Sequence, residues 1–260
     1  ATSLWPLRGF LARAARSADR TVAISRYTAD QVRRLGARDV PVIPYTIGVS
    51  ADPLERPLTH AGPFTVLFVG RLVERKGVHV LLEALRCVPT DVPVRAVIVG
   101  DGAELEALRA LANRLGVTDR VTFTGRVPWE ELRRAYRDAD VCVLPAVVDR
   151  RGDTEGLGVV LLEAMHHRVP VIGSDLGGIP DVIEDRVSGV LVPPGDPAAL
   201  AAAIAGLARD PALARRLGDA GYRRATDEFS WPAIVSRWAR VYEALEAPGP
   251  DQARRNTNTN

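Results

Sequence analysis

Short apolar runs alternate with segments of helical pattern along most of the chain. The runs are continuously apolar, which is typical of strands buried on both faces, and they cover Phe64–Val69, Val94–Val99, Val121–Thr124, Val141–Leu144, Val169–Ile172 and Val190–Val192. Helices are expected between them at Val78–Cys87, Ala103–Leu115, Pro128–Ala139, Val159–His167 and Ile179–Ile183. Strands joined through helices pair in parallel with right-handed crossovers. The predicted fold class is therefore α/β, with a doubly wound parallel sheet flanked by helices.

The pattern changes on both sides of this alternating region. Before it we expect, in order, a helix, a strand, a helix ended by Gly36, a strand-like run and a Pro- and Gly-rich linker, at Trp5–Ser17, Arg20–Ser25, Tyr27–Leu35, Pro41–Ile47 and Gly48–Pro63. After it we expect helices at Pro197–Leu207, Pro211–Thr226 and Pro232–Leu245, then a disordered tail from Ala247. The predicted parts are residues 1–50, 51–230, 231–246 and 247–260.

Composition excludes several classes of protein. The 34 basic and 32 acidic residues give a net charge of +2, which argues against a nucleic-acid binder. The two cysteines, Cys87 and Cys142, are too few for a disulfide scaffold, and we expect buried thiols in a reducing compartment. No apolar run reaches the ~18 residues of a membrane helix, and no signal peptide is apparent. These features predict a cytoplasmic protein; because the chain starts at Ala1 and its one methionine is Met165, we expect a piece of a longer protein.

The single lysine of the chain stands in a loop suited to phosphate. All other basic residues are arginines, whereas Lys76 lies in GRLVERKG, Gly70–Gly77, directly after the first buried strand. Ligands of open parallel sheets bind beyond the carboxyl ends of the strands. Arg71 and Lys76 would there present two cations at a helix start, a site for a phosphate ester. The alternative is a solvated turn with ordinary surface charges.

Two glutamates flank a pair of glycines at a second predicted helix start. In EGLGVVLLE, Glu155 and Glu163 are eight residues apart, about 12 Å along an ideal helix, with Gly156 and Gly158 between them. Carboxylates accept hydrogen bonds from hydroxyls, and free backbone N–H groups at a helix start favour an anion. The pattern suits a ligand with hydroxyls at both ends and a diphosphate between them, as in a nucleotide sugar. The alternative is a capping acid and a surface acid.

Three further loops follow predicted strands, and other patterns argue against metal or nicotinamide sites. Gly177 and Gly178 permit close approach of a ligand to the backbone, whereas VGDG (99–102) and TGRV (124–127) could line a base pocket; ordinary turns are the alternative for each. Asp138-Ala-Asp140 resembles a metal motif but precedes a strand, at the wrong end of the sheet. The four histidines lack metal-ligand spacing, and GDGAEL lacks the third glycine of a dinucleotide fingerprint.

The order of these motifs along one chain is more specific than any of them alone. VGRLVERKG, VGDG, FTGRV, ADVCVLP, EGLGVVLLEAM, PVIGSDLGGIPDVI and GVLVPPGD occur in succession from Val69 to Asp196. In this order they resemble the C-terminal, donor-binding domain of GT-B fold glycosyltransferases, of the group 1, family 4 retaining type. That domain is Rossmann-like. The resemblance extends upstream to ADRTVAIS and VPVIPYTIGV, which are similar to the last strands of the N-terminal domain and the linker.

The resemblance implies an activity and a role for each site residue. It implies transfer of a hexose from a nucleotide diphosphate sugar to an acceptor hydroxyl, with retention and without a metal or a cofactor. Glu155, Arg71 and Lys76 would be catalytic, Arg71 and Lys76 by holding the diphosphate. Glu163 would bind ribose hydroxyls, and Val127 would meet the base through its backbone. The implied donor-binding set is Gly70, Arg71, Lys76, Gly102, Val127, Glu155, Gly156, Leu157, Gly158, Val159 and Glu163.

Two departures and two rival functions accompany this hypothesis. Leu157 stands where the family usually has an aromatic residue, and most of the acceptor-side N-terminal domain is missing. Residues 1–50 would be the remnant of this domain, and residues 231–246 would form the helix that crosses back to it. The missing domain would be a partner of this chain, and a peripheral membrane contact would be made through it. The rivals are a non-catalytic nucleotide-binding module and a GT-B sugar epimerase.

Overall fold

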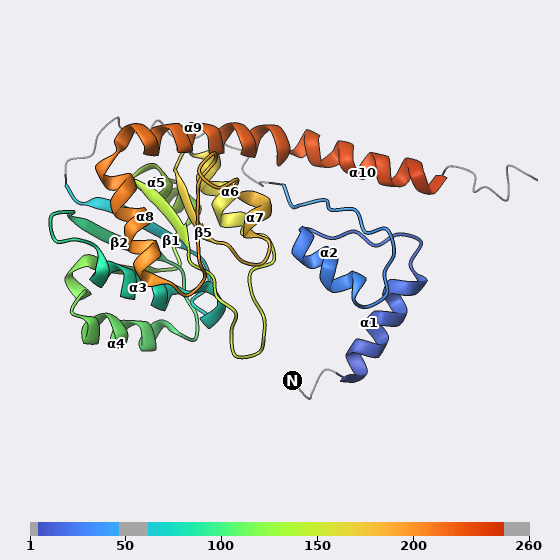
Figure 1. The fold of residues 1–260 in the computed structure, drawn as a ribbon, viewed down its shortest axis with the longest axis horizontal. Helices are drawn as coiled ribbons and strands as arrows, with labels where there is room; N and C mark the ends of the chain where they lie inside the picture. The colour runs from blue at the N-terminus through green and yellow to red at the C-terminus, as the bar shows by residue number, and fades with distance from the viewer. Residues whose placement is uncertain (1–4, 47–61, 247–260) are drawn as a thin grey trace, which may run out of the picture. The chain divides into compact units, whose positions relative to one another are not determined.

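The computed structural model describes residues 5–46 and 62–246, which form two compact units. One unit joins residues up to Thr46 with those from Glu228 onward, and the other runs from Ile47 to Asp227. Figure 1 labels the elements of both. The predicted linker and the tail from Ala247 fall almost entirely outside the described residues.

The larger unit is built on a six-stranded parallel sheet. Its strands lie in the order β3-β2-β1-β4-β5-β6. They comprise β1 (Phe64–Val69), β2 (Val94–Val99), β3 (Val121–Gly125), β4 (Val141–Leu144), β5 (Val171–Ser174) and β6 (Val190–Val192). The predicted α/β doubly wound sheet is confirmed, and β1, β2, β4 and β6 have the predicted bounds. β5 begins two residues later than expected, after Pro170, which has no N–H for a sheet hydrogen bond.

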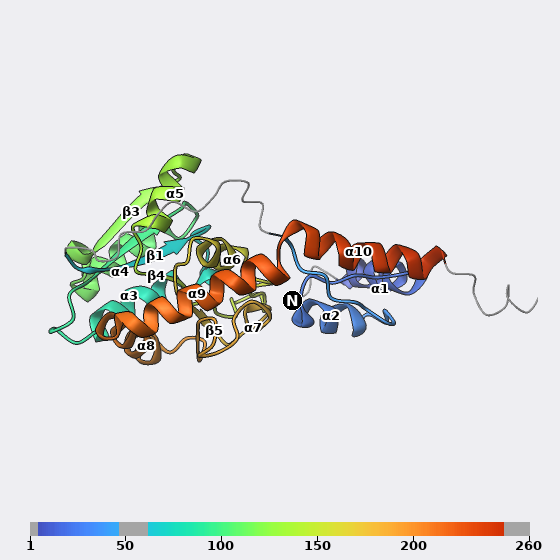
Figure 2. The same ribbon diagram turned by 90° about the horizontal axis from the view of Figure 1, so that it is seen from above.

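Helices cover both faces of this sheet. They are α3 (Val78–Cys87), α4 (Leu105–Leu115), α5 (Trp129–Arg137), α6 (Val159–His166), α7 (Ile179–Val182), α8 (Pro197–Arg209) and α9 (Pro211–Glu228). In Figure 1, α3, α4 and α8 lie on one side of the sheet and α5 and α6 on the other, and Figure 2 shows the same sheet from above. Asp196 caps α8 through the N–H of Ala199, at 2.9 Å, as its position before a proline predicts.

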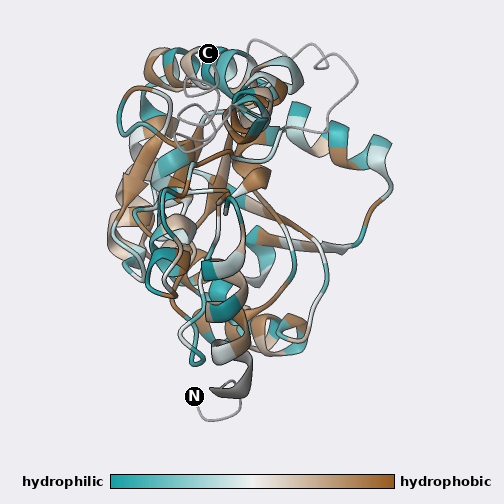
Figure 3. Cartoon of the chain, turned by 90° about the vertical axis from the view of Figure 1, so that its right-hand side faces the viewer, coloured by the Kyte–Doolittle hydropathy of each residue, from teal (hydrophilic) through white to brown (hydrophobic). Residues whose placement is uncertain are grey.

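The core of this unit is aliphatic. The strands are mainly brown in Figure 3, whereas the helices carry both teal and brown, and Leu67, Phe68 and Leu144 are completely buried. Cys142 on β4 is buried as predicted. The prediction for Cys87 is wrong: this thiol ends α3 and is exposed, because it lies beside exposed Arg86 on the outer side of the last turn, whereas Leu85 and Val88 are buried.

The smaller unit contains α1 (Trp5–Ser17), α2 (Arg26–Arg33) and α10 (Trp231–Glu246). A small alanine-rich cluster centred on Ala23, Ala29 and Val40 packs its first part together. The two strands predicted here, at 20–25 and 41–47, are reduced among the described residues to one parallel bridge between Ala23 and Val42. A pair of strands without further neighbours is marginal in water, which accounts for the difference.

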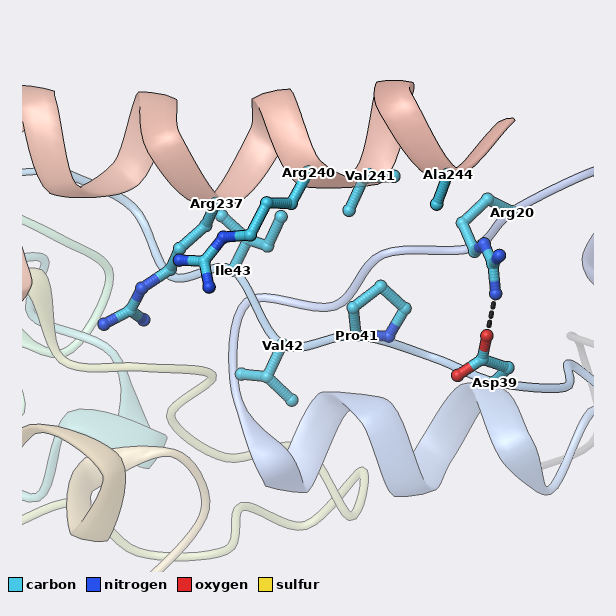
Figure 4. A pocket seen from close by; sticks show the side chains of 9 residues that line it. All are labelled: Arg20, Asp39, Pro41, Val42, Ile43, Arg237, Arg240, Val241 and Ala244. Atoms are coloured by element: carbon cyan, nitrogen blue, oxygen red, sulfur yellow. Dashed lines mark hydrogen bonds and ion pairs between the residues drawn. The ribbon is translucent and has the colours of Figure 1, made fainter. Parts of the chain in front are cut away.

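Helix α10 carries an exposed apolar stripe. The stripe consists of large side chains spaced by four, three, four and three residues, one face of a helix: Trp231, Val235, Trp238, Tyr242 and Leu245. Other residues of α10 line a groove of about 460 Å³ within the same unit, opposite Pro41–Ile43 (Figure 4). Arg20 and Asp39 form an ion pair at its edge.

Candidate functional site

The sheet order places a topological switch point between β1 and β4, where a ligand crevice is expected. Chain connections run outward from β1 in one direction and from β4 in the other, so their following loops separate at the carboxyl edge. Open α/β sheets bind ligands at this switch point. The loops concerned are residues 70–77 after β1 and residues 145–158 after β4, which hold the lysine and the first glutamate singled out in the sequence.

Gly77 brings the two loops into contact. Its φ is +69°, and a Cβ at this position would lie 1.7 Å from the carbonyl oxygen of Pro145, so only glycine fits. The N–H of Val147 donates to the carbonyl of Arg75 at 3.0 Å. The preceding turn, η1 (Glu74–Lys76), is a single turn of 3-10 helix. It therefore directs its two cations toward the loop after β4.

An ion cluster links the two loops. Glu155 Oε2 accepts from Lys76 Nζ at 2.6 Å and from an Arg75 guanidinium nitrogen at 3.3 Å. Glu155 Oε1 accepts from the N–H of Gly158 at 3.2 Å. The three charged side chains are only 11–18% exposed. The structure thus places Lys76 and Glu155 in direct contact.

The cluster controls the charge of Glu155. Burial acts to raise the pKa of this carboxyl, but the charges of Lys76 and Arg75 and the hydrogen bond from Lys76 outweigh it. The net result is a pKa below the ordinary value, so Glu155 is an anion at neutral pH. A carboxylate held between two cations and a helix start is a site where charge is fixed in advance of a ligand.

Arg75 belongs to the site, although the sequence did not single it out. Besides Glu155, its guanidinium lies 3.6 Å from the carboxylate of Asp153 and 3.5 Å from the carbonyl of Thr154. The chain has 33 arginines, and nothing in the residues around Arg75 indicates that this arginine contacts Glu155. Arg71, which the sequence did single out, is exposed on the same loop, directly after Gly70.

Gly177 and Gly178 pack against the glutamate loop. A Cβ at Gly177 would lie 2.2 Å from the carbonyl oxygen of Glu155, and one at Gly178 would lie 2.0 Å from that of Gly156. The N–H of Gly178 also donates to Glu155 O at 3.0 Å. Both glycines thus allow a close approach of the protein's own backbone, and the ligand approach expected from them stays a prediction. The backbone contact fixes the segment that carries Glu155.

The second glutamate lies apart from the ion cluster. Helix α6 begins at Val159, after Gly158 at φ +92°, so Glu155 precedes the helix and the helical spacing assumed from the sequence does not apply. Glu163 Oε2 accepts from the hydroxyl of Tyr136 on α5 at 2.7 Å. Burial raises the pKa of Glu163, opposed in part by this hydrogen bond.

The remaining predicted site residues are placed as follows. Gly102 packs on the loop after β1, because a Cβ there would lie 2.3 Å from Leu72 O. Gly156, Val159 and Val127 are partly buried, and Leu157 is 2% exposed and belongs to the core. The N–H of Gly100 donates to Gly125 O at 2.8 Å, so the loops after β2 and β3 are joined at this edge.

The aspartates of the rejected metal motif have structural roles. Asp140 Oδ2 accepts from the N–H of Thr65 at 2.7 Å, at the start of β1, and Asp138 pairs with Arg137 at 2.6 Å. Across residues 5–46 and 62–246, no group of three or more His, Cys, Asp or Glu side chains is arranged to hold a metal ion. No helix in this part of the chain is long and apolar enough to cross a bilayer.

Comparisons with known proteins agree with the fold and the motif order. Residues 54–224 match the family described as glycosyl transferases group 1. A GDP-mannose-dependent α-(1-6)-phosphatidylinositol monomannoside mannosyltransferase of Mycolicibacterium smegmatis is 40% identical over 182 residues, which cover 69% of this chain and 47% of that protein. Glycogen synthase of Mycobacterium tuberculosis is 31% identical over 235 residues, 89% of this chain and 55% of that protein.

A solved structure shows the same similarity in three dimensions. The Anabaena protein HepE in complex with UDP superposes with a TM-score of 0.79 at 25% identity, covering 93% of this chain and 68% of that one. The chain spans about half the length of the curated relatives it matches. Since the family match covers most of the chain, this protein belongs to the group 1 glycosyl transferases and shares the GT-B type of α/β fold with them.

Proposed function

We propose that this chain is the donor-binding half of a retaining glycosyltransferase. It would bind a nucleoside diphosphate hexose in the β1–β4 crevice and take part in transfer of the hexose to an acceptor hydroxyl. The observation that carries the proposal is the contact between Lys76, Arg75 and Glu155 at the switch point of the sheet. Its relatives support the donor class: one is named as GDP-mannose-dependent, and HepE was solved with UDP-glucose.

The cations act on the leaving group. As the bond from the anomeric carbon to the diphosphate oxygen breaks, its electron pair passes to the diphosphate. Lys76 and Arg71 stabilise the developing negative charge, together with the N-terminal end of α6. The acceptor oxygen bonds to the anomeric carbon on the same face, and its proton passes to the departing diphosphate oxygen.

Lys76 is held against Glu155 in the structure, so donor binding has to redistribute this contact. A diphosphate offers Lys76 a second anion, while Arg75 remains to hold the carboxylate of Glu155. Glu155 then faces the hexose hydroxyls beside the backbone of Gly156 to Gly158. Glu163 accepts from the ribose hydroxyls, and Val127 meets the base through its backbone.

The acceptor would bind to the part of the relatives that this chain does not span. The exposed stripe of α10 gives a physical reason to expect a partner there, because large apolar patches mark contact surfaces. The complete activity is therefore assigned to the longer protein, with nucleotide binding measurable on the chain itself.

Calorimetry with GDP, UDP and ADP on the 260-residue chain tests donor binding. Binding of at least one of them, weakened about tenfold or more by Lys76→Ala, is expected, because a direct contact between charged groups is lost. Arg209→Ala is the matched control, since Arg209 is an exposed cation that pairs with Asp91. Equal nucleotide affinities of both variants and the wild type would refute the proposed contact between Lys76 and the diphosphate.

Sugar transfer is tested on the longer protein with GDP-mannose and UDP-glucose as donors. Glu155→Ala is expected to lower turnover by about two to three orders of magnitude, in the range known for lost electrostatic groups in active sites. The anomeric configuration of the product reports retention. An inverted product would refute the retaining mechanism while leaving donor binding intact.

A further inference from the structure

Tyr136 is completely buried, yet its hydroxyl is directed at a carboxylate. It lies in the last turn of α5 and donates to Glu163 Oε2 at 2.7 Å, bridging α5 and α6. Its ring stacks on His167, which follows α6, with centroids 5.2 Å apart and planes 15° from parallel. Because the ring is buried and stacked, its hydroxyl is held at the carboxylate of Glu163.

The surroundings of Glu163 make that donor necessary. Burial is the larger effect and raises the pKa of Glu163, whereas the hydrogen bond from Tyr136 lowers it. The charge of this carboxylate acts on Tyr136 from α5 and on Cys142 from β4. Their own pKa values are raised by burial and by the charge of Glu163, so both remain protonated. The ring of His167 stacks on that of Tyr136.

The hydrogen bond leaves acceptor capacity on the carboxylate. An ionised carboxylate has about four acceptor positions on two oxygens, and Tyr136 uses one of them on Oε2. Two neighbouring hydroxyls of a ligand can be bound by the rest only if the group is ionised and its plane is fixed. The hydrogen bond from Tyr136 orients the carboxylate and favours its ionised form.

We infer that Tyr136 is a positioning residue whose hydroxyl orients the carboxylate of Glu163 and favours its charged form, so that Glu163 selects ligands carrying the vicinal hydroxyls of ribose. The inference rests on the proposed function, in which Glu163 meets the ribose of the donor, and it extends that function to the origin of sugar selectivity in the nucleotide. Tyr136 touches no substrate itself and acts through Glu163.

The test compares nucleotides with and without ribose hydroxyls. Calorimetry on the full chain measures the affinities of GDP and UDP and of their 2′,3′-dideoxy forms, between pH 5 and 8. The variants are Tyr136→Phe, which removes one hydroxyl and keeps the ring, and Glu163→Gln. Tyr222→Phe is the matched control: its ring is partly buried beside His166 and Arg168, away from Glu163.

We expect the wild type to prefer the ribose forms by about tenfold or more, since hydrogen bonds to a charged group carry this discrimination. Glu163→Gln should reduce the preference to within about threefold. Tyr136→Phe should lie between them, and its preference should be lost at a higher pH than in the wild type, because the pKa of Glu163 rises without the hydroxyl. Tyr222→Phe should match the wild type in the ratio and in the pH profile.

The outcomes separate this inference from the proposed function. Absence of binding of GDP, UDP and ADP to the wild type would refute the proposed function, and the inference with it. An unchanged ribose preference in Glu163→Gln would refute the role of Glu163 while leaving donor binding in place. If Glu163→Gln loses the preference but Tyr136→Phe keeps the wild-type ratio and pH profile, the inference alone is wrong. A merely structural role of Tyr136 would weaken all nucleotides equally and leave the ratio unchanged.

Discussion

Glu155 neutralises Lys76 and Arg75, which lie where the diphosphate of the proposed donor would bind. The substitution Glu155→Gln is therefore informative. The amide keeps the size of the side chain and can still accept from the N–H of Gly158, but it leaves Lys76 and Arg75 without their shared anion. We expect the variant to be less stable than the wild type in the absence of ligand, and to recover more stability than the wild type when a nucleoside diphosphate is added.

The magnitude follows from the burial of the three side chains. Removing one partner of a fully buried ion pair costs about 3–5 kcal/mol, because the remaining charge is desolvated without compensation. Here the three side chains retain 11–18% exposure, so water recovers part of that loss and we expect about 2–4 kcal/mol. In a protein of this size, about 1 kcal/mol shifts the melting temperature by roughly 2–4 °C, which gives a decrease of about 5–15 °C.

Thermal unfolding followed by circular dichroism, with and without GDP or UDP, measures both effects. A ligand at about 100 times its Kd stabilises the folded state by about 2.7 kcal/mol, and the anionic diphosphate should add more in the variant than in the wild type. Glu74→Gln is the control: Glu74 is on the same loop, 35% exposed, and pairs with Arg150, which is 91% exposed. It should stay within about 0.5 kcal/mol of the wild type. A Glu155→Gln variant as stable as Glu74→Gln, or one that loses its response to nucleotide, would contradict the reasoning.

Three further predictions concern the loops, the thiols and the second glutamate. Gly77→Ala should destabilise the fold by about 2–4 kcal/mol in urea unfolding and abolish nucleotide binding, because its Cβ meets Pro145 O, whereas Gly206→Ala in open space within α8 should stabilise by about 0.5–1 kcal/mol. A thiol reagent should titrate one cysteine of the native chain, Cys87, and both after unfolding, since Cys142 is buried and burial raises the pKa of its thiol; two fast thiols in the native state would be inconsistent with the structure. Because the pKa of Glu163 is raised in the folded protein, its contribution to stability is greatest below the ordinary value near 4.5 and is lost as pH rises through the raised pKa. The stability of Glu163→Gln relative to the wild type, measured by urea unfolding between pH 4 and 8, should therefore increase with pH. A decrease with pH would contradict a raised pKa of Glu163.

The sheet could be predicted because its signal is local and redundant. Runs such as Phe64–Val69 are apolar at nearly every position, and this pattern is typical of strands buried on both faces. The prediction of two strands near Ala23 and Val42 failed because a stable strand needs neighbouring strands to pair with, and a sequence pattern does not show whether they are present. The prediction for Cys87 failed because exposure at the end of α3 depends on which side of the last turn the residue occupies, not on the residue type.

A site residue could be predicted where its residue type is rare in the chain. It could not be predicted where the backbone geometry decides which way the side chain points. Lys76 was apparent because it is the only lysine of the chain. Arg75 was hidden among many arginines, and its direction is set by the 3-10 turn and the left-handed Gly77 that follows. Tyr136 is 27 residues from Glu163, and a helical pattern places a tyrosine on the buried face without showing what its hydroxyl reaches.

The ionised forms of Glu155 and Glu163 are favoured by different means, and this difference bears on what each can do. Glu155 is anionic because two cations surround it, so its charge is held most firmly in the absence of a ligand and is redistributed when a diphosphate enters. Burial opposes the charge of Glu163 and raises its pKa, whereas one neutral donor, Tyr136, favours the ionised form without depending on a diphosphate. A group that exchanges partners on ligand binding suits the reacting end of a donor, where charge moves during transfer. A group held by a fixed neutral donor suits the end that is only recognised.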